Sequence, residues 1–196
     1  MRGLSGRLEA ANVAIDAANA NDPTAVVVRE VASALALAHG RLAAEWVQRL
    51  VPSADDALLL AARAHHLRRW EVPRSRYPEG RAGYLRWRTD QKARHAVDVE
   101  AILHDAGYEA TTIAQVQALI RRDNLKTDPD AQVLEDAACL VFIETQLSAM
   151  STRLDHAHLI DVIRKTAAKM SATGILFVAE LPLDDATRAL LGEALG

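Results

Sequence analysis

Apolar residues recur along most of this chain with the three- to four-residue spacing of amphipathic helices. The pattern and its interruptions predict helices over residues 6–20, from about 24 or 29 to 50, 53–70, 88–106, 111–122, 127–150 and 156–170, and a last helix from Asp184 or Asp185. A short apolar run at 175–181 fits either a strand or a helix. We therefore expect an all-α fold, a single-domain bundle of about seven to eight helices over residues 1–196.

Polar and helix-breaking residues set the expected boundaries. Ser53 with Asp56 three residues later has the spacing of a capping box and predicts a helix start. Pro73 must end the third helix, and Gly107 suits the position just past the end of the fourth. Between these helices, residues 71–86 form the longest stretch without helical periodicity. Long irregular segments inside compact domains often carry function.

Composition excludes several classes of protein. A single cysteine, Cys139, excludes a disulfide framework and a cysteine-based zinc knuckle. No apolar run reaches the roughly 20 residues of a membrane span, and the charged first 16 residues lack the apolar core of a signal peptide. Only 4% of the residues are aromatic, which argues against RNA recognition by base stacking. We expect a cytoplasmic protein without a membrane partner.

Charge is distributed unevenly along the chain. The segment from Arg63 to Arg94 holds ten Lys/Arg and three Asp/Glu, whereas the rest holds 13 basic and 23 acidic residues. The segment is thus at +7 and the remainder at −10. A basic segment of this kind is typical of a surface or pocket that binds anions.

Histidine and carboxylate positions suggest a metal site. His65 and His66 lie near the end of the third predicted helix, His95 lies on the apolar face of the fourth, and Asp136 falls on the apolar stripe of the sixth, beside Glu135. A carboxylate on an apolar stripe is costly unless it is paired or metal-bound. Imidazole and carboxylate together suit a divalent Mn, Fe, Zn or Mg ion. The alternative is that Asp136 forms a buried ion pair with an arginine and the histidines are core residues.

The basic segment also combines arginines with aromatic residues and turns. Guanidinium groups suit phosphate or carboxylate, so the segment could be an anion-binding loop that covers a site. It could equally be a long connection that aromatic packing and salt bridges hold in place. Two lysines one turn apart near the C-terminus could reach the same anion or simply face solvent. The candidate substrate-binding residues are Arg74, Tyr77, Tyr84, Arg88, Lys165 and Lys169.

Several stretches in a specific order resemble an uncharacterised family, domain of unknown function 4202. The longest are AANANDP at 17–23 and AARAHHLRRWEVPR at 61–74. The shorter ones are YP at 77–78, GY at 83–84, WR at 87–88, HA at 95–96, AGY at 106–108, LED at 134–136, CLVF at 139–142, RKT at 164–166 and KMS at 169–171. The resemblance covers nearly the whole chain.

This family's helix order in turn looks like that of HD-domain metal-dependent phosphohydrolases. Such enzymes bind metal through one histidine, a His-Asp doublet and a final aspartate. The resemblance implies that His39 is the first histidine, His66 the histidine of the doublet and Asp136 the last ligand. Leu67 stands where the doublet has aspartate, so His95 is expected to substitute as a ligand, and His65 is a further candidate.

Three functions follow from these observations. The leading one is a metal-dependent hydrolase of a small phosphorylated or nucleotide-like substrate, with Glu135 or Glu71 as the base and Arg69 among the cations that neutralise the substrate. The second is an iron-dependent oxygenase on an HD-type scaffold. The third is a non-enzymatic helical module that binds an anionic ligand, RNA or an acidic protein through residues 63–94. Nucleic acid is the less favoured partner, and a homodimer is left open.

Overall fold

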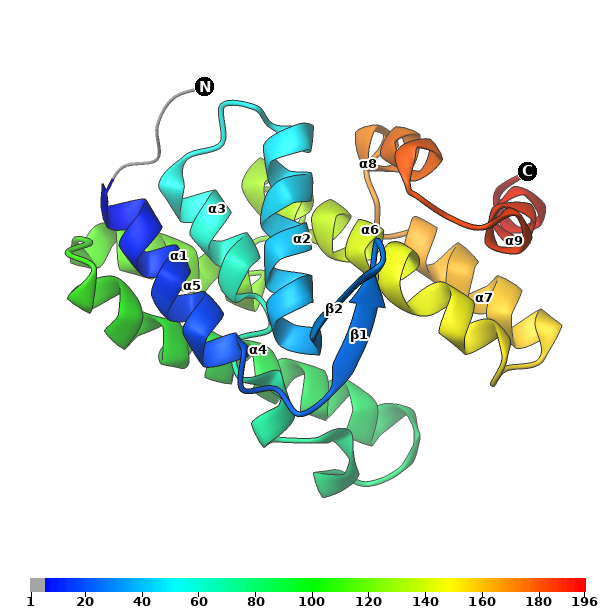
Figure 1. The fold of residues 1–196 in the computed structure, drawn as a ribbon, viewed down its shortest axis with the longest axis horizontal. Helices are drawn as coiled ribbons and strands as arrows, with labels where there is room; N and C mark the ends of the chain where they lie inside the picture. The colour runs from blue at the N-terminus through cyan, green and yellow to red at the C-terminus, as the bar shows by residue number, and fades with distance from the viewer. Residues whose placement is uncertain (1–5) are drawn as a thin grey trace.

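Nine α-helices and one β-hairpin make up residues 6–196, the part of the chain that the computed structural model describes. The helices are α1 (Gly6–Asn19), α2 (Leu35–Leu50), α3 (Asp56–Ala64), α4 (Gly80–Asp105), α5 (Ala110–Arg121), α6 (Pro129–Ser151), α7 (His156–Ala167), α8 (Ala172–Phe177) and α9 (Asp185–Leu195). Strands β1 (Ala25–Val28) and β2 (Val31–Ala34) pair antiparallel, and 3-10 turns lie at Arg69–Glu71, Arg74–Arg76 and Val178–Glu180. The fold is all-α, as the hydrophobic pattern predicts (Figure 1).

Helix α3 lies at the centre of the core. Seven of its nine residues are buried, because its sequence is apolar on every side, which only a fully surrounded helix tolerates. It packs against α1, α2, α5 and α6, and Figure 1 shows it beside α2. The chain leaves α3 at His65 and His66, so the histidine pair is attached to the most buried helix of the fold.

The hairpin replaces the first turns of the predicted second helix. Residues 25–28 alternate between exposed and half-buried positions, and a β-branched run such as Val26–Val28 favours a strand. Arg29 and Glu30 both have positive φ, 48° and 68°, as a two-residue hairpin turn of type I′ requires. The usual Asn-Gly signal for that turn is absent, so the sequence pattern missed it. Helix α2 therefore begins at Leu35.

Ion pairs hold the hairpin tip against two helices. Arg29 Nη1 lies 2.8 Å from Glu45 Oε1 on α2, and Arg29 Nε lies 2.7 Å from Glu144 Oε1 on α6. Glu144 also accepts a hydrogen bond from Trp46 Nε1 at 3.0 Å. These contacts fix the tip of the hairpin against the C-terminal half of α2 and against α6.

The predicted third helix is too long and the fourth too short. Helix α3 ends at Ala64, and four residues later Arg68 takes the left-handed conformation with φ 51°, through which a helix cannot continue to residue 70. Helix α4 begins at Gly80, where Gly83 lies so close to the Pro78 carbonyl that an added Cβ would be 1.9 Å from its oxygen. The segment between α3 and α4 therefore covers residues 65–79, so it is about as long as predicted but lies closer to the N-terminus.

The C-terminal third forms a smaller group of helices beside α6. The stretch 175–181, where the sequence left strand and helix open, holds the end of helix α8 and the 3-10 turn that follows it. Helices α7 and α9 contact each other, and α6 contacts both α7 and α8; Figure 1 shows this group at one end of the molecule. Within residues 6–196 no helix combines the length and apolar character needed to cross a membrane.

The N-cap of α3 is Asp55, not Ser53. Asp55 Oδ1 accepts a hydrogen bond from Leu58 N at 2.9 Å. Replacing Asp55 by alanine removes this bond, and we expect the free energy of unfolding, measured in urea, to fall by about 1 kcal/mol. Ser53→Ala, which changes an exposed side chain, is the control and should leave stability unchanged. The opposite ranking would contradict the assignment.

Candidate anion-binding pocket

Four histidines from three segments converge beneath the basic segment. His39 lies on α2, His65 and His66 follow α3, and His95 lies on α4. The ring centroid of His66 is 4.0 Å from that of His65, 5.3 Å from that of His39 and 6.3 Å from that of His95. The structure thus brings together all four histidines that the sequence singled out as inward-facing or as candidate ligands.

A hydrogen-bonded chain determines the tautomers of two of them. Thr145 Oγ1 donates to the Val141 carbonyl at 2.7 Å and lies 3.0 Å from His39 Nε2. The hydroxyl therefore accepts from His39 Nε2–H, which leaves His39 Nδ1 as an acceptor. His66 Nδ1 lies 3.2 Å from that nitrogen and must carry the proton between them. With the protons assigned in this way from the hydrogen-bond chain, His66 carries its proton on Nδ1, and its Nε2 has a free lone pair.

Burial keeps these histidines neutral. It lowers the pKa of His39 to about 4, with a further contribution from the charge of Arg69, and nearby Asp22 only partly opposes this. It lowers the pKa of His65 and His66 well below 6.5 and that of His95 to about 3. Desolvation disfavours the imidazolium in each case. A neutral imidazole can accept a proton at neutral pH.

His95 has the least satisfied side chain of the group. It is 1% exposed, and among the described residues neither ring nitrogen has a well-formed hydrogen bond. An interaction with the backbone of Leu67 raises its pKa slightly but does not offset burial. His65 is better placed, because its Nδ1 lies 2.8 Å from the Ala62 carbonyl. Buried polar atoms without partners are uncommon and call for an explanation.

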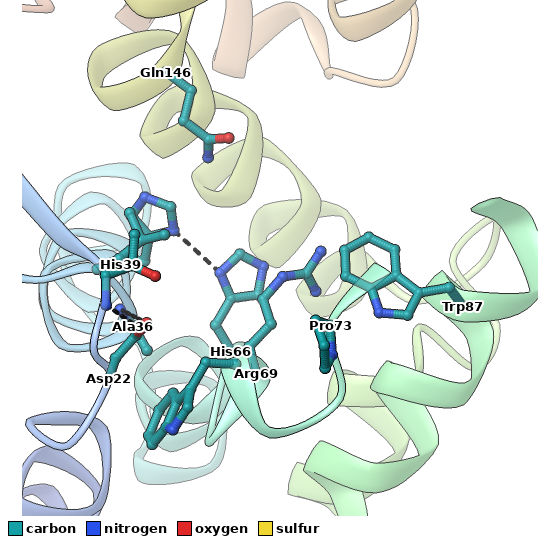
Figure 2. A pocket seen from close by; sticks show the side chains of 11 residues that line it. Asp22, Ala36, His39, His66, Arg69, Pro73, Trp87 and Gln146 are labelled. Atoms are coloured by element: carbon teal, nitrogen blue, oxygen red, sulfur yellow. Dashed lines mark hydrogen bonds between the residues drawn. The ribbon is translucent and has the colours of Figure 1, made fainter. Parts of the chain in front are cut away.

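A pocket of about 220 Å³ opens beside His39 and His66. Figure 2 shows side chains from distant parts of the chain around it. Its walls include Asp22, Ala36, His39, His66, Arg69, Trp87 and Gln146. Both carboxylate oxygens of Asp22 are engaged by backbone groups, accepting from Thr24 N at 2.9 Å and Ala36 N at 3.0 Å. Asp22 therefore shapes the wall and the start of α2; sequence analysis did not select it.

Arg69 is the cation in this pocket. Its guanidinium lies over the Trp87 ring, 4.4 Å from the centroid, and Figure 2 shows it between His66 and Trp87. Burial lowers its pKa to about 10, and the charge of Arg88 adds to this effect. Over residues 6–196 its guanidinium forms no hydrogen bond or ion pair. A half-buried guanidinium with five unused N–H donors is suited to an anionic ligand.

The predicted metal ligand Asp136 is engaged elsewhere. Its Oδ1 accepts from Ser171 N at 2.8 Å and Gln132 Nε2 at 3.0 Å, and its Oδ2 accepts from Ser171 Oγ at 2.5 Å. These bonds join α6 to the start of α8. Across the described residues, no three His, Cys, Asp or Glu side chains are grouped so that they could hold a metal ion. As arranged, His66, His95 and Asp136 do not fit a divalent metal.

The buried ion pair of α6 belongs to Glu135. Glu135 Oε2 lies 3.1 Å from Arg122 Nε, and the two side chains are 9% and 6% exposed. Burial disfavours the Glu135 carboxylate, but Arg122 outweighs it and lowers the pKa of Glu135. Since Arg122 occupies this carboxylate, the structure gives Glu135 a stabilising partner rather than a free base. Glu71, the other predicted base, is exposed and pairs with Arg94 at 3.0 Å.

The remaining predicted residues divide between structural contacts and the surface. Arg74 donates to the carbonyls of Tyr77, Pro78 and Gly80 and so stabilises the loop. Tyr77 donates to Asp90 at the surface, and exposed Lys165 pairs with Asp161.

Two predicted residues form a stack and a third faces solvent. Tyr84 is 44% exposed, and Arg88 lies over its ring, 5.8 Å from the centroid. Lys169 is exposed and forms no side-chain ion pair among the described residues. Sequence analysis missed Thr145 and Lys92, because a threonine on a helix and one lysine in a basic segment carry no distinguishing pattern.

The comparisons with known proteins identify a family and no individual relative. The family described as Domain of unknown function (DUF4202) matches residues 9–191. No curated protein matches the chain, and no solved structure does. Because the match spans almost all of the sequence, including every element of the pocket, this chain belongs to the DUF4202 family.

Proposed function

We propose that the chain is a hydrolase of a small phosphorylated substrate, with Arg69 holding the phosphoryl group and His66 acting as the general base. The observation that carries this proposal is one juxtaposition: a half-buried guanidinium without a counterion lies beside a neutral histidine with a free nitrogen. A pocket of about 220 Å³ is below the roughly 300–1,000 Å³ of drug-sized sites. It suits a phosphoryl group and a few further atoms.

The proposed chemistry uses the residues present. Arg69 neutralises the phosphoryl oxygens, which favours attack by water on phosphorus. As the water oxygen bonds to phosphorus, His66 Nε2 accepts its proton and the P–O bond to the ester oxygen breaks; His66 then returns the proton to the leaving alkoxide, which gives inorganic phosphate and an alcohol. The bond from His66 Nδ1 to His39 Nδ1 orients the ring. His39 is held in turn by Thr145. A base oriented by a second hydrogen-bonded group is the usual arrangement in acid–base catalysis.

The finer predictions from the residues and from the resemblance remain predictions. They are the relationship to HD-domain enzymes, the divalent metal, the iron-dependent alternative and the cytoplasmic location. No step of the proposed reaction passes through a metal, since the predicted ligand set is not assembled. If a chelator abolished hydrolysis and Mn²⁺ restored it, the metal-dependent hypothesis would replace this one.

Binding of inorganic phosphate and hydrolysis of a phosphomonoester panel test the proposal. We expect Arg69→Met to weaken phosphate binding, measured by calorimetry, by at least tenfold, because it removes the charged donors. We expect His66→Gln to keep binding but to lower the hydrolysis rate by about 100-fold, a typical loss for a general base.

Arg76→Met is the matched control, since Arg76 is an exposed arginine of the same segment. Equal phosphate affinity in the wild type and Arg69→Met would overturn the binding site. Binding without turnover of any phosphomonoester would favour the non-enzymatic anion-binding module instead.

A further inference from the structure

We propose that the substrate carries a chain of two or three phosphoryl groups, which leaves the pocket at Arg69 and runs along α4 past Arg88 and Lys92. This inference rests on the proposed function of the pocket and specifies its substrate class. The charge of Lys169 also acts on Lys92, so a further cation lies near this row.

The row follows one stripe of α4. Tyr84, Arg88 and Lys92 are spaced four residues apart, so their side chains lie on one face of the helix. Each step along the stripe is about 6 Å at 1.5 Å per residue. Arg88 and Lys92 thus offer two cationic groups one turn apart, so an extended anion with several phosphoryl groups can contact both.

These cations lack the partners that their neighbours have. Arg69, Arg88 and Lys92 are half-buried, and no ion pair or side-chain hydrogen bond engages them within the described part of the chain. In the same segment, Arg63 pairs with Asp16 at 2.6 Å and Arg94 with Glu71 at 3.0 Å. Half-burying a cation without a counterion is unfavourable. An anionic ligand would supply the counterion.

The cations are also close enough to repel one another. Burial lowers the pKa of Lys92 to about 8, and the charges of Arg122, Arg88 and Lys169 lower it further. Arg88 likewise lowers the pKa of Arg69, so it links the pocket to the rest of the row. Glu135 is the carboxylate that opposes this effect at Lys92, but Arg122 holds it at 3.1 Å. The row therefore keeps an excess of positive charge.

A nucleic acid is a less suitable occupant than a short polyphosphate. The arginines that a long backbone would contact, such as Arg68, Arg76 and Arg81, are exposed, whereas the cations of the row are half-buried. Binding to a long backbone would depend steeply on salt and would require those exposed charges. A short chain held by the half-buried cations would not require them.

Calorimetric titration with inorganic phosphate, pyrophosphate and tripolyphosphate tests the inference. We expect the wild type to bind tripolyphosphate at least tenfold more tightly than phosphate. Arg88→Met and Lys92→Met should each reduce that ratio about fivefold while phosphate affinity stays within twofold. Arg86→Met, an exposed residue of the same helix, is the matched control, and Lys92→Arg should retain the preference.

The outcomes separate the two proposals. If phosphate binds through Arg69 but the preference for tripolyphosphate is absent or survives Arg88→Met and Lys92→Met, the extended row is wrong and the pocket stands. If no phosphate binds, or binding survives Arg69→Met, the proposed function fails at its first step. A third outcome would favour a nucleic-acid surface over the row. In that case the protein shows no preference for tripolyphosphate but binds single-stranded RNA, and the triple variant Arg68→Met, Arg76→Met, Arg81→Met loses RNA binding.

Discussion

Replacing Gly40 by alanine is expected to lower the free energy of unfolding by about 3 kcal/mol, the upper part of the range for overpacking a core. A Cβ at this position of α2 would lie 2.4 Å from the backbone carbonyl oxygen of Arg63 on α3. Backbone atoms cannot rotate away, so the two helices must separate. His39 lies on α2 and His66 follows α3, so the 3.2 Å distance between their Nδ1 atoms should increase when the helices separate.

Urea unfolding at pH 7 measures this effect, with phosphate titration as a second readout. Gly192→Ala is the matched control, because Gly192 lies within helix α9 and an added Cβ meets nothing within 4 Å. Alanine is a better helix former than glycine by roughly 1 kcal/mol, so this variant should be as stable as the wild type or slightly more stable. A Gly40→Ala protein of unchanged stability would refute the close approach of α2 and α3.

Acidification from pH 7 to pH 5 is expected to remove several kcal/mol of stability. Burial holds the pKa of His39 at about 4 and that of His95 at about 3, whereas unfolded histidines titrate near 6.5. Below about pH 6.5 the unfolded chain therefore binds more protons than the folded one. The stability due to neutral burial is present above pH 6.5 and is lost as the pH falls towards 4. Each histidine accounts for about 2 kcal/mol between pH 7 and pH 5, and His65 acts in the same direction.

Urea unfolding at pH 7, 6 and 5 measures this loss. The double variant His39→Gln, His95→Gln should show a shallower pH dependence, even if it is less stable at pH 7. His104→Gln changes a histidine whose side chain is 81% exposed and should leave the curve unchanged. A wild-type stability that is flat over this pH range would mean that the pKa values of these histidines in the folded protein lie near 6.5, so that burial does not lower them.

Helical periodicity predicted the all-α fold because most helices have an apolar face and end at glycine, proline or a polar cap. It failed where tertiary contacts decide the backbone. The hairpin depends on the left-handed residues Arg29 and Glu30, and ion pairs of Arg29 with α2 and α6 hold the turn in place. The end of α3 depends on the left-handed Arg68, whose amide is bound by Asn19 of α1 at 3.1 Å. No local pattern encodes such contacts between distant residues.

The candidate site was predicted in part. The apolar stripe of α4 correctly buried His95, but His66 lies beyond the end of α3, so the turn after that helix rather than a helical stripe places it near His95. The same argument placed Asp136 with them, yet a buried carboxylate can be satisfied by any nearby donors, and Ser171 supplies two. Periodicity states that a side chain points inward but not which neighbours it meets. Arg69 was selected for its charge, while its lack of a counterion became evident only in three dimensions.

The walls of the pocket come from segments spread over most of the chain, from Asp22 through His39, His66 and Trp87 to Gln146. No partly folded intermediate that lacks one of these segments can form the complete site. A ligand should therefore bind the native state alone and shift the folding equilibrium by mass action, by about 2.7 kcal/mol at 100 times its dissociation constant. The melting temperature of the protein can thus serve as the screen that identifies its substrate.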